Sequence, residues 1–238
     1  MNITFFSSFD QVPFPACPDP GKIHVWLLPI YNNGLIGADF KYLSLEEQKR
    51  SARFSKPGDR QRYLASHAAL RKILASYLAY PAQDLVFSSN EYGKPFLSYP
   101  HGRQHRPVHF SLSHSGEYTA LAFSFSSPVG IDIEKSRASV KPLEISKRFY
   151  HPKEASQIAS LPSQEQGFLF FQLWTLREAF LKGLGTGFHT APDSFCICPD
   201  PGFDAFHIEE GPVSFSDWKL VSLSAPEGYF CSLAFLES

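Results

Sequence analysis

Apolar residues recur at helical spacing in two long segments of this chain. Residues 45–80 are interrupted by the loop sequence KPGD at 56–59, and their apolar face comprises Leu64, Ala68, Leu70, Ile73, Leu74 and Tyr77. Residues 165–184 form a second strongly helical segment, and a shorter helix is predicted at residues 141–148. The chain therefore contains at least three helices.

Other segments alternate between apolar and polar residues or are almost continuously apolar, which predicts strands. These segments lie at residues 23–29, 108–113, 118–125, 130–135, 195–198, 218–223 and 229–235. The sequence NEYGKP at 90–95 has the composition of a turn. Helices and strands mixed in this way predict an α+β fold.

The chain contains a weak internal echo. An RF dipeptide at 53–54 precedes a proline-containing loop and a long helix, and a second RF dipeptide at 148–149 is followed by the same features. Strands follow in both halves. This echo predicts two copies of one α+β unit, with domains at residues 1–127 and 128–238.

Charge divides along the same boundary. Residues 128–238 hold 9 of the 22 Lys and Arg residues and 14 of the 23 Asp and Glu residues, which leaves 13 basic and 9 acidic residues in 1–127. The basic excess is concentrated in residues 47–72. Such a division suits an anionic ligand together with a cation, although charge alone favours a helix with a solvated basic face. No nucleic-acid partner is expected, because neither a binding motif nor a strongly basic pI accompanies the cluster.

Cysteine usage and hydropathy bear on the compartment. The four cysteines, at positions 17, 196, 198 and 231, have a spacing typical of neither a disulfide framework nor a zinc site, and Cys196 and Cys198 alternate with apolar residues as in a strand. The N-terminal residues lack the basic region of a signal peptide, and no apolar run approaches the roughly 18 residues of a membrane span. We expect a cytoplasmic protein with no membrane association.

Two acids follow the apolar strand at 118–125 in the sequence GIDIEK. In a strand, Asp132 and Glu134 share one face while Ile131 and Ile133 share the other. Since the isoleucines belong in the core, the acids are expected to face a cleft or solvent. They either hold a divalent cation, which would relieve their repulsion, or guard an exposed strand edge with charge.

The helix at 165–184 favours the cation. Phe171, Trp174 and Leu181 fall within about 80° of one another, and Glu178 lies in the middle of this apolar stripe with Lys182 at its edge. A carboxylate among apolar groups is costly unless it is paired or binds a metal. Three carboxylates without paired histidines or cysteines indicate a hard cation, for which Mg²⁺ fits best and Mn²⁺ is a further candidate. Because Mg²⁺ takes remaining ligands from substrate phosphates, a polyphosphate substrate is expected.

Two other motifs allow competing interpretations. The glycines in GLGTG at 183–187 follow a helix, so they indicate a C-cap and turn and not a phosphate-binding loop. The sequence SLSHSG at 111–116 lacks a nucleophile elbow, which argues against a Ser–His nucleophile. His114 at the strand end is therefore either a phosphate or adenine contact or a plain turn histidine.

Taken together, these pieces resemble the 4′-phosphopantetheinyl transferases of the surfactin-synthetase-activating (Sfp) type. The resemblance covers residues 45–195 and rests on RFSKPGDRQRYL, NEYGKPFL, FSLSHSGEY, GIDIEK, RFYHPKE and LWTLREAFLKGLGTG, in the family's order and spacing. It implies two similar α+β subdomains related by a pseudo-twofold axis, with the active site between them. It also implies transfer of the phosphopantetheine arm of coenzyme A to a serine of an apo acyl or peptidyl carrier protein, with release of adenosine 3′,5′-bisphosphate. We expect a monomer.

The resemblance also implies roles for individual residues. Asp132, Glu134 and Glu178 would bind Mg²⁺, Glu178 would deprotonate the carrier serine, and Lys182 would contact the pyrophosphate and help protonate the leaving phosphate. The expected contacts to coenzyme A are Ser113 and His114 at the 3′-phosphate, Gly93, Lys94 and Pro95 beside the adenine and phosphate, Arg50 and Arg62 as charge contacts, and Glu154 near the pantetheine or a metal-bound water. Arg177 stands where the family usually has Lys, and Glu47 stands where relatives carry a basic residue.

Two other functions use the same residues. An Mg²⁺-dependent phosphohydrolase could employ the same acids, and a non-catalytic module could bind coenzyme A without reacting. The second is disfavoured by the presence of all four residues Asp132, Glu134, Glu178 and Lys182. Rapid release of adenosine 3′,5′-bisphosphate without a carrier protein would favour the first.

Overall fold

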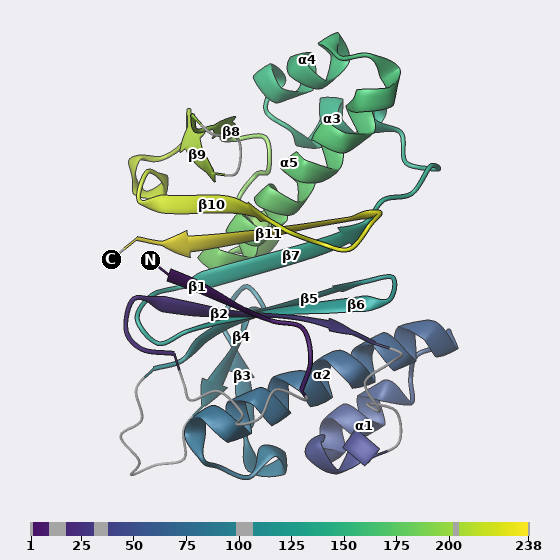
Figure 1. The fold of residues 1–238 in the computed structure, drawn as a ribbon, viewed down its shortest axis with the longest axis vertical. Coiled ribbons are helices and arrows are strands. Elements are labelled where there is room, and N and C mark those ends of the chain that lie inside the picture. The colour runs from purple at the N-terminus through teal and green to yellow at the C-terminus, as the bar shows by residue number, and fades with distance from the viewer. Residues whose placement is uncertain (1, 10–17, 31–37, 99–106, 202–204, 238) are drawn as a thin grey trace. The chain divides into compact units, whose positions relative to one another are not determined.

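The computed structural model describes residues 2–9, 18–30, 38–98, 107–201 and 205–237. Cys17 and residues 101–106 lie outside these ranges. The chain divides into two compact units, one of Met1–Asn90 with Pro95–Ser126 and one of Glu91–Lys94 with Ser127–Ser238. Each unit contains helices and a sheet, so the prediction of an α+β fold is confirmed (Figure 1).

The first unit is a four-stranded sheet with helices on one face. Its strands are β1 (Asn2–Phe6), β2 (Lys22–Pro29), β5 (His109–Ser115) and β6 (Tyr118–Ser124), in the order β1-β2-β6-β5 with only β1 and β2 parallel. Its helices are α1 (Leu45–Ser51) and α2 (Pro57–Leu78), and a hairpin of β3 (Val86–Ser89) and β4 (Pro95–Ser98) stands apart from the sheet.

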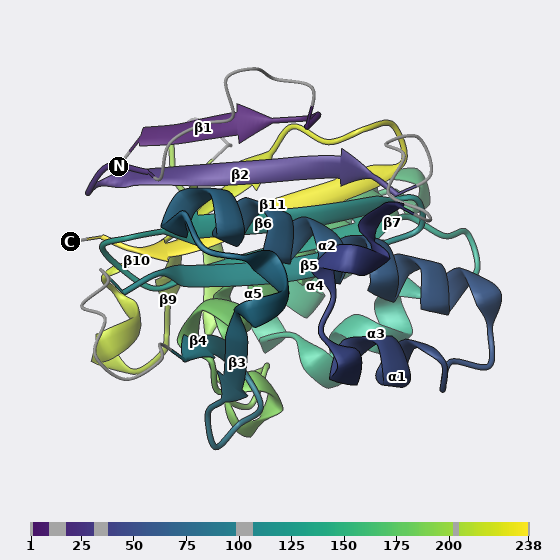
Figure 2. The same cartoon turned by 90° about the horizontal axis from the view of Figure 1, so that it is seen from below.

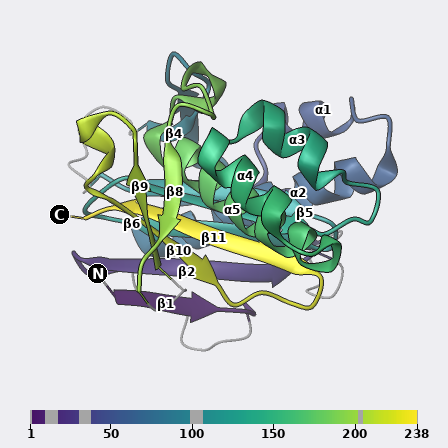
Figure 3. The same cartoon turned by 90° about the horizontal axis from the view of Figure 1, so that it is seen from above.

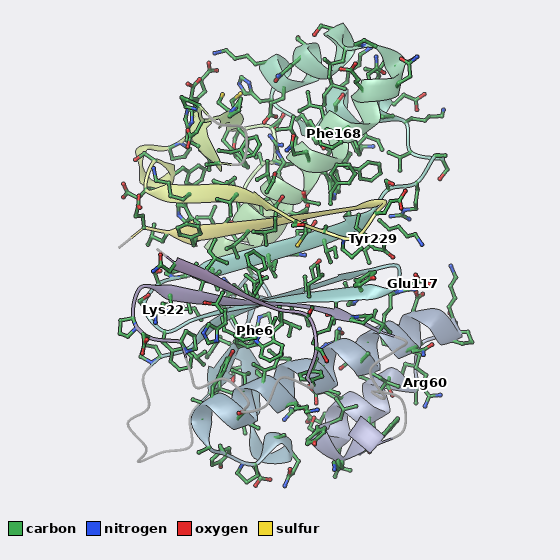
Figure 4. All side chains as sticks on the ribbon, viewed as in Figure 1. Phe6, Lys22, Arg60, Glu117, Phe168 and Tyr229 are labelled. Atoms are coloured by element: carbon green, nitrogen blue, oxygen red, sulfur yellow. The ribbon has the colours of Figure 1, made fainter. Side chains whose placement is uncertain are left out.

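The core of this unit lies between α2 and the sheet (Figure 2). Ile73 and Leu74 of α2 pack in one cluster with Trp26 of β2 and with Leu121 and Phe123 of β6. The opposite side of α2 is polar, and Arg60 is exposed on it (Figure 4). The apolar face predicted for residues 64–77 is thus the face that builds this core.

The second unit is a five-stranded sheet covered by three helices. Its elements are β7 (Val129–Lys135), α3 (Pro142–Phe149), α4 (Pro152–Ser160), α5 (Ser163–Leu184), β8 (Cys196–Pro199), β9 (Ala205–Glu209), β10 (Trp218–Leu223) and β11 (Tyr229–Leu236). The strand order is β7-β11-β10-β9-β8, and every pairing is antiparallel. The long helix α5 packs along β7 and β11, with α3 and α4 beside it (Figure 3).

The two units share one order of connections. In the first, β2 leads through helices to β5 and β6, and β6 returns to pair with β2. In the second, β7 leads through helices to β10 and β11, and β11 returns to pair with β7. Between the helices and the last two strands, the first unit carries the β3–β4 hairpin and the second unit carries β8 and β9.

The structure contains elements that the sequence patterns did not predict: β1, the β3–β4 hairpin, β9 and α4. The sequence HPK at 151–153 suggested a loop before one long helix. Instead, Pro152 occupies the first turn of α4, where its missing N–H costs nothing. His151 caps this helix, and Glu154 accepts a hydrogen bond from the His151 backbone N–H at 3.0 Å. None of the helices in the described ranges is long and apolar enough to cross a membrane.

Glu47 connects α1 to α2. Its carboxylate closes a capping box with Ser44 and accepts a hydrogen bond from Nε of Arg71 at 2.5 Å, while His67 Nδ1 lies 3.2 Å from its other oxygen. Burial opposes ionisation, but these hydrogen bonds and the Arg71 charge lower the pKa of Glu47 to about 2. This residue, which departs from the family pattern, is therefore part of the folded framework.

We predict that Glu47→Gln lowers the free energy of unfolding by about 3 kcal/mol at pH 7, because it leaves the buried Arg71 guanidinium without its counter-charge. The folded pKa lies below the unfolded one, so the stabilisation is present above pH 4.5 and is lost as the pH falls towards 2. Urea unfolding of wild type and variant at several pH values measures the difference. Glu46→Gln, on the exposed side of α1, is the matched control, and equal losses in both variants would contradict the assignment.

Candidate active site

Strand β7 carries its two acids on the face that α5 covers. Ile131 and Ile133 are fully buried on the opposite face. Gly130 shares the face of Asp132 and Glu134, and a side-chain carbon added at Gly130 would lie 1.9 Å from the Ala179 carbonyl oxygen of α5. The prediction that both acids face a cleft or solvent is therefore wrong for Asp132, which is 3% exposed, whereas Glu134 is half-buried.

Two glycines permit the close approach of β7 and α5. A side-chain carbon at Gly130 would also meet the Gly183 backbone, and one at Gly183 would lie 2.5 Å from the ring of Trp218. Gly183 is thus a packing residue inside the helix. The predicted C-cap is Gly185, whose φ of 77° is in the left-handed region that glycine favours. The glycines of GLGTG therefore serve different purposes.

This approach brings Asp132 and Lys182 into contact. Nζ of Lys182 donates a hydrogen bond to Oδ1 of Asp132 at 2.6 Å, and the lysine side chain remains one-third exposed. A lysine on the sheet-facing side of α5 therefore meets an acid of β7. The contact joins two of the residues that sequence analysis singled out for catalysis.

Glu178 lies one helical turn before Lys182 and faces the same group of charges. Burial raises the pKa of Glu178 above its ordinary value, and the negative charges of Asp132 and Glu134 add to this effect while Lys182 opposes it. The carboxylates are thus close enough to disfavour one another's ionisation. A divalent cation would remove that repulsion.

The donor set fits Mg²⁺ or Mn²⁺, since it consists of carboxylate oxygens with no sulfur or imidazole among them. The three side chains do not form a closed ligand cluster as they stand. Within the part of the chain that the structure describes, the only three ligand atoms within 4.8 Å of one another belong to other residues. Asp132, Glu134 and Glu178 therefore need side-chain rotation to share one ion, and Asp132 has to exchange part of its contact with Lys182.

Glu154 does not join this group. It is 1% exposed, and its two carboxylate oxygens accept hydrogen bonds from the guanidinium of Arg177 at 2.5 Å, the Ile197 N–H at 2.8 Å and the His151 N–H. A carboxylate enclosed in this way is fitted to the fold, so the structure argues against its expected contact with pantetheine or a metal-bound water. This expectation is corrected to a structural role.

Arg177 offsets the free-energy cost of burying the Glu154 carboxylate. It is 2% exposed, and besides Glu154 it donates to the carbonyl oxygens of Pro192 at 2.7 Å and Phe195 at 3.3 Å. Its guanidinium also lies 4.7 Å from the centroid of the Tyr150 ring. The positive charge at this position therefore ties α5 to α4 and β8 and does not face the acids of β7.

The turn at residues 91–94 belongs to the second unit. Nζ of Lys94 donates a hydrogen bond to the Gly183 carbonyl oxygen at 2.8 Å, and burial lowers the pKa of Lys94 to about 8. Gly93 has a φ of 87°, which favours glycine in this turn. Lys94 thus lies beside the last turn of α5. Its partner Gly183 directly follows Lys182 in the chain.

The remaining predicted contacts belong to the first unit. Arg50 of α1 lines a hollow of about 680 Å³ together with Glu46, Lys49, Arg53 and Phe54, and its guanidinium stacks near Tyr63. Arg62 pairs with Asp59. On β5, His114 is exposed while Ser113 is buried and accepts a hydrogen bond from Thr119 at its carbonyl oxygen. Pro95 is exposed at the start of β4.

Comparisons with known proteins identify the family of this chain. Residues 128–234 match the model of the 4′-phosphopantetheinyl transferase superfamily, and residues 36–126 match that of the 4′-phosphopantetheinyl transferase N-terminal region. The 4′-phosphopantetheinyl transferase gsp of Aneurinibacillus migulanus is 33% identical over 82% of this chain and 77% of its own length. The chain belongs to the 4′-phosphopantetheinyl transferase superfamily.

Other members of the superfamily are about as similar. The transferase Sfp of Bacillus subtilis is 34% identical over 66% of both chains, and HetI of a Nostoc species is 32% identical over 70% of both. The superfamily match at 128–234 contains Asp132, Glu178 and Lys182, and the N-terminal match contains Arg50 and His114. The chain is therefore a phosphopantetheinyl transferase, an enzyme, as the sequence motifs predicted.

The spacing between β7 and α5 in this transferase yields a direct prediction. Gly130→Ala should force the two elements apart, since the added carbon has no room against the helix backbone, and should separate Asp132 from Lys182. We expect the melting temperature to fall by several degrees and the transfer rate to fall at least tenfold, or about 1.4 kcal/mol.

Gly167→Ala is the matched control, because nothing lies within 4 Å of a carbon added at that helical position. This variant should be as stable as wild type or slightly more stable, since alanine favours helices. Thermal unfolding and initial transfer rates measure both variants. Wild-type stability and activity in Gly130→Ala would show that the close approach is not needed.

Proposed function

We propose that this enzyme transfers the 4′-phosphopantetheine arm of coenzyme A to a serine hydroxyl of an apo carrier protein in an Mg²⁺-dependent reaction. Adenosine 3′,5′-bisphosphate is the other product. The observation that carries the proposal is the meeting of Asp132, Glu178 and Lys182 where β7 packs against α5. This arrangement supplies both signs of charge, as a pyrophosphate reaction requires.

Asp132, Glu134 and Glu178 are the residues that would hold the metal. When bound, Mg²⁺ would neutralise charge on the pyrophosphate and stabilise the departing bisphosphate. In addition, ligation would lower the cost of keeping carboxylates ionised near one another, which is the cost that raises the pKa of Glu178 through burial and through Asp132. The proposed cation would thus relieve the electrostatic repulsion that already exists among these carboxylates.

Glu178 is suited to accept the proton of the attacking serine. It is partly buried, so its carboxylate is a stronger base than a solvated one, yet it remains accessible. The serine oxygen forms a bond to the pantetheine-side phosphorus as the bond from that phosphorus to the bridging oxygen breaks. The serine proton passes to Glu178, and the electron pair of the broken bond leaves with the bisphosphate.

Lys182 would stabilise the negative charge that develops on the departing bisphosphate. Its ammonium group contacts Asp132 and its side chain is one-third exposed, so it can exchange that contact for a phosphate oxygen. In the first unit, the basic hollow of α1 and the exposed His114 support a role in holding the phosphates of coenzyme A.

Mass spectrometry of an apo carrier protein incubated with coenzyme A tests the proposal. In the presence of Mg²⁺ the carrier should gain one phosphopantetheine group for each bisphosphate released, and a chelator should abolish both. Without a carrier protein, bisphosphate release should be slow. Rapid release without a carrier would instead identify a hydrolase, and tight binding without any product would identify a binding module.

Glu178→Gln should reduce transfer by at least a hundredfold, because the amide cannot accept the serine proton. The same variant should melt at a higher temperature than wild type at neutral pH without Mg²⁺. The folded pKa of Glu178 lies above its unfolded value, so ionisation costs the folded state stability above pH 4.5, and the amide carries no such cost.

Two measurements check this prediction together. Added Mg²⁺ should raise the melting temperature of wild type more than that of Glu178→Gln, as expected for loss of a ligand. Glu165→Gln, in the first turn of α5, is the control and should leave transfer unchanged. Transfer by Glu178→Gln within a few-fold of wild type would remove Glu178 from the reaction.

Lys182→Ala should lower kcat more than it raises the KM for coenzyme A, since the charge is needed most as the bisphosphate departs. Lys182→Arg should recover part of the loss because it restores the charge at a slightly different position. Steady-state kinetics at saturating Mg²⁺ separates the two constants. A change confined to KM would make Lys182 a binding residue.

A further inference from the structure

The ribbon of β8 and β9 gathers metal-binding side chains on one face. In its register, Cys196 lies opposite Glu209 and Cys198 lies opposite His207. Directly opposed residues in an antiparallel pair point to the same side, as do residues two apart in one strand. The two thiols, the imidazole and the carboxylate therefore share one face, although they are distant from the acids of β7 in sequence.

The other face of the ribbon is fixed by the core. Ile197, Phe206 and Ile208 are buried in the main apolar cluster of this unit. The Ile197 N–H also donates to the enclosed Glu154, and Arg177 binds the neighbouring Phe195 carbonyl. These contacts anchor one face of the ribbon in the core, and this holds the backbone that carries the polar side chains in position.

The distances within the cluster suit a tetrahedral ion. Ligand atoms of Cys198, His207 and Glu209 all lie within 4.8 Å of one another. Sγ of Cys196 is 3.7 Å from Sγ of Cys198, and Nε2 of His207 is 3.3 Å from Oε1 of Glu209. Tetrahedral Zn²⁺, with bonds of about 2.3 Å to sulfur and about 2.0–2.1 Å to nitrogen and oxygen, requires ligand separations of about 3.8 Å and 3.3 Å.

The imidazole is also oriented for ligation. Nδ1 of His207 lies 2.5 Å from Oδ1 of Asp200, which directs Nε2 towards Glu209. A carboxylate on the far nitrogen fixes the tautomer and ring position of metal-binding histidines. This outer contact is independent of the four proposed ligands.

We propose that Cys196, Cys198, His207 and Glu209 form a structural Zn²⁺ site. Thiolate and imidazole donors favour a soft or borderline ion over Mg²⁺, and four protein ligands close the coordination shell as in structural zinc sites. Cys198, His207 and Glu209 form the core of the site, and Cys196 completes it by turning towards them. The bound ion cross-links β8 to β9 and takes no part in transfer.

The spacing of the cysteines argued against a zinc site, because C-x-C followed by H-x-E belongs to no common zinc motif, and the proposal departs from that expectation. The ligands meet only through the pairing of two short strands, of which β9 was not predicted. The alternative fate of the thiols is a disulfide between Cys196 and Cys198, which reductant would reverse.

Titration of the metal-stripped protein with Co²⁺ under a non-thiol reductant tests the site. Cobalt bound by thiolates in a tetrahedron gives sulfur-to-cobalt charge-transfer absorption, which carboxylate sites lack, together with ligand-field bands more intense than those of an octahedral oxygen site. We expect these bands to saturate at one equivalent and to disappear when Zn²⁺ is added. Cys198→Ser and His207→Gln should weaken binding at least tenfold, and Glu209→Gln, which alters an exposed side chain, should do so without disturbing the fold.

Two controls separate this site from the rest of the protein. Cys231→Ala removes a buried thiol of β11 and Asp132→Ala removes an acid of β7, and both should keep the cobalt bands. Zn²⁺ should raise the melting temperature of wild type but not of Cys198→Ser, while transfer by Cys198→Ser stays within about twofold of wild type. Absence of thiolate bands, or bands that survive in Cys198→Ser and Glu209→Gln, would overturn the proposal.

Discussion

The contact between Asp132 and Lys182 is the interaction on which the rest of the site depends. It exists because β7 and α5 approach within the space that Gly130 and Gly183 leave open. The approach buries an acid beneath a helix, and the same geometry sets Glu178 among like charges. Such a cluster costs folding free energy unless cations join it. We regard this cost as the physical basis of the metal and pyrophosphate binding proposed above.

Adjacent residues of α5 are used in opposite ways. Arg177 is fully enclosed and joins Glu154, α4 and β8 into one buried framework, whereas Glu178 next to it keeps a partly exposed carboxylate. The framework anchors α5, and the proposed catalytic role of Glu178 requires such a fixed position. The buried pair thus serves the structure, and the partly exposed acid is left for the proposed chemistry.

Much of this could be predicted from the sequence. Helical spacing of apolar residues located α2 and α5, and alternating or almost continuously apolar runs located β2, β7, β10 and β11. The motifs around Asp132 and Glu178 identified the family, which the comparisons confirmed. Glu178 and Lys182 were expected in the middle and at the edge of the apolar stripe of their helix, and both side chains are partly buried.

Features that depend on contacts between distant segments could not be predicted. Alternation showed that Asp132 opposes the isoleucines, but only the packing of α5 shows which face is covered. Glu154 resembled a ligand-binding acid until the structure placed it against Arg177 and the Ile197 N–H. Likewise, the thiols of β8 acquire potential partners only through the register with β9. The sequence shows which residue types stand at each position, but it does not show which distant residues they contact.

Anomalous diffraction from crystals grown with coenzyme A and Mn²⁺ tests the central claim most directly. Manganese replaces magnesium at oxygen sites and is visible through its anomalous signal. We predict a peak about 2.1 Å from carboxylate oxygens of Asp132, Glu134 and Glu178, with pyrophosphate oxygens completing the shell. A fully bound pyrophosphate with no peak beside these residues, or a peak held by other side chains, would contradict it.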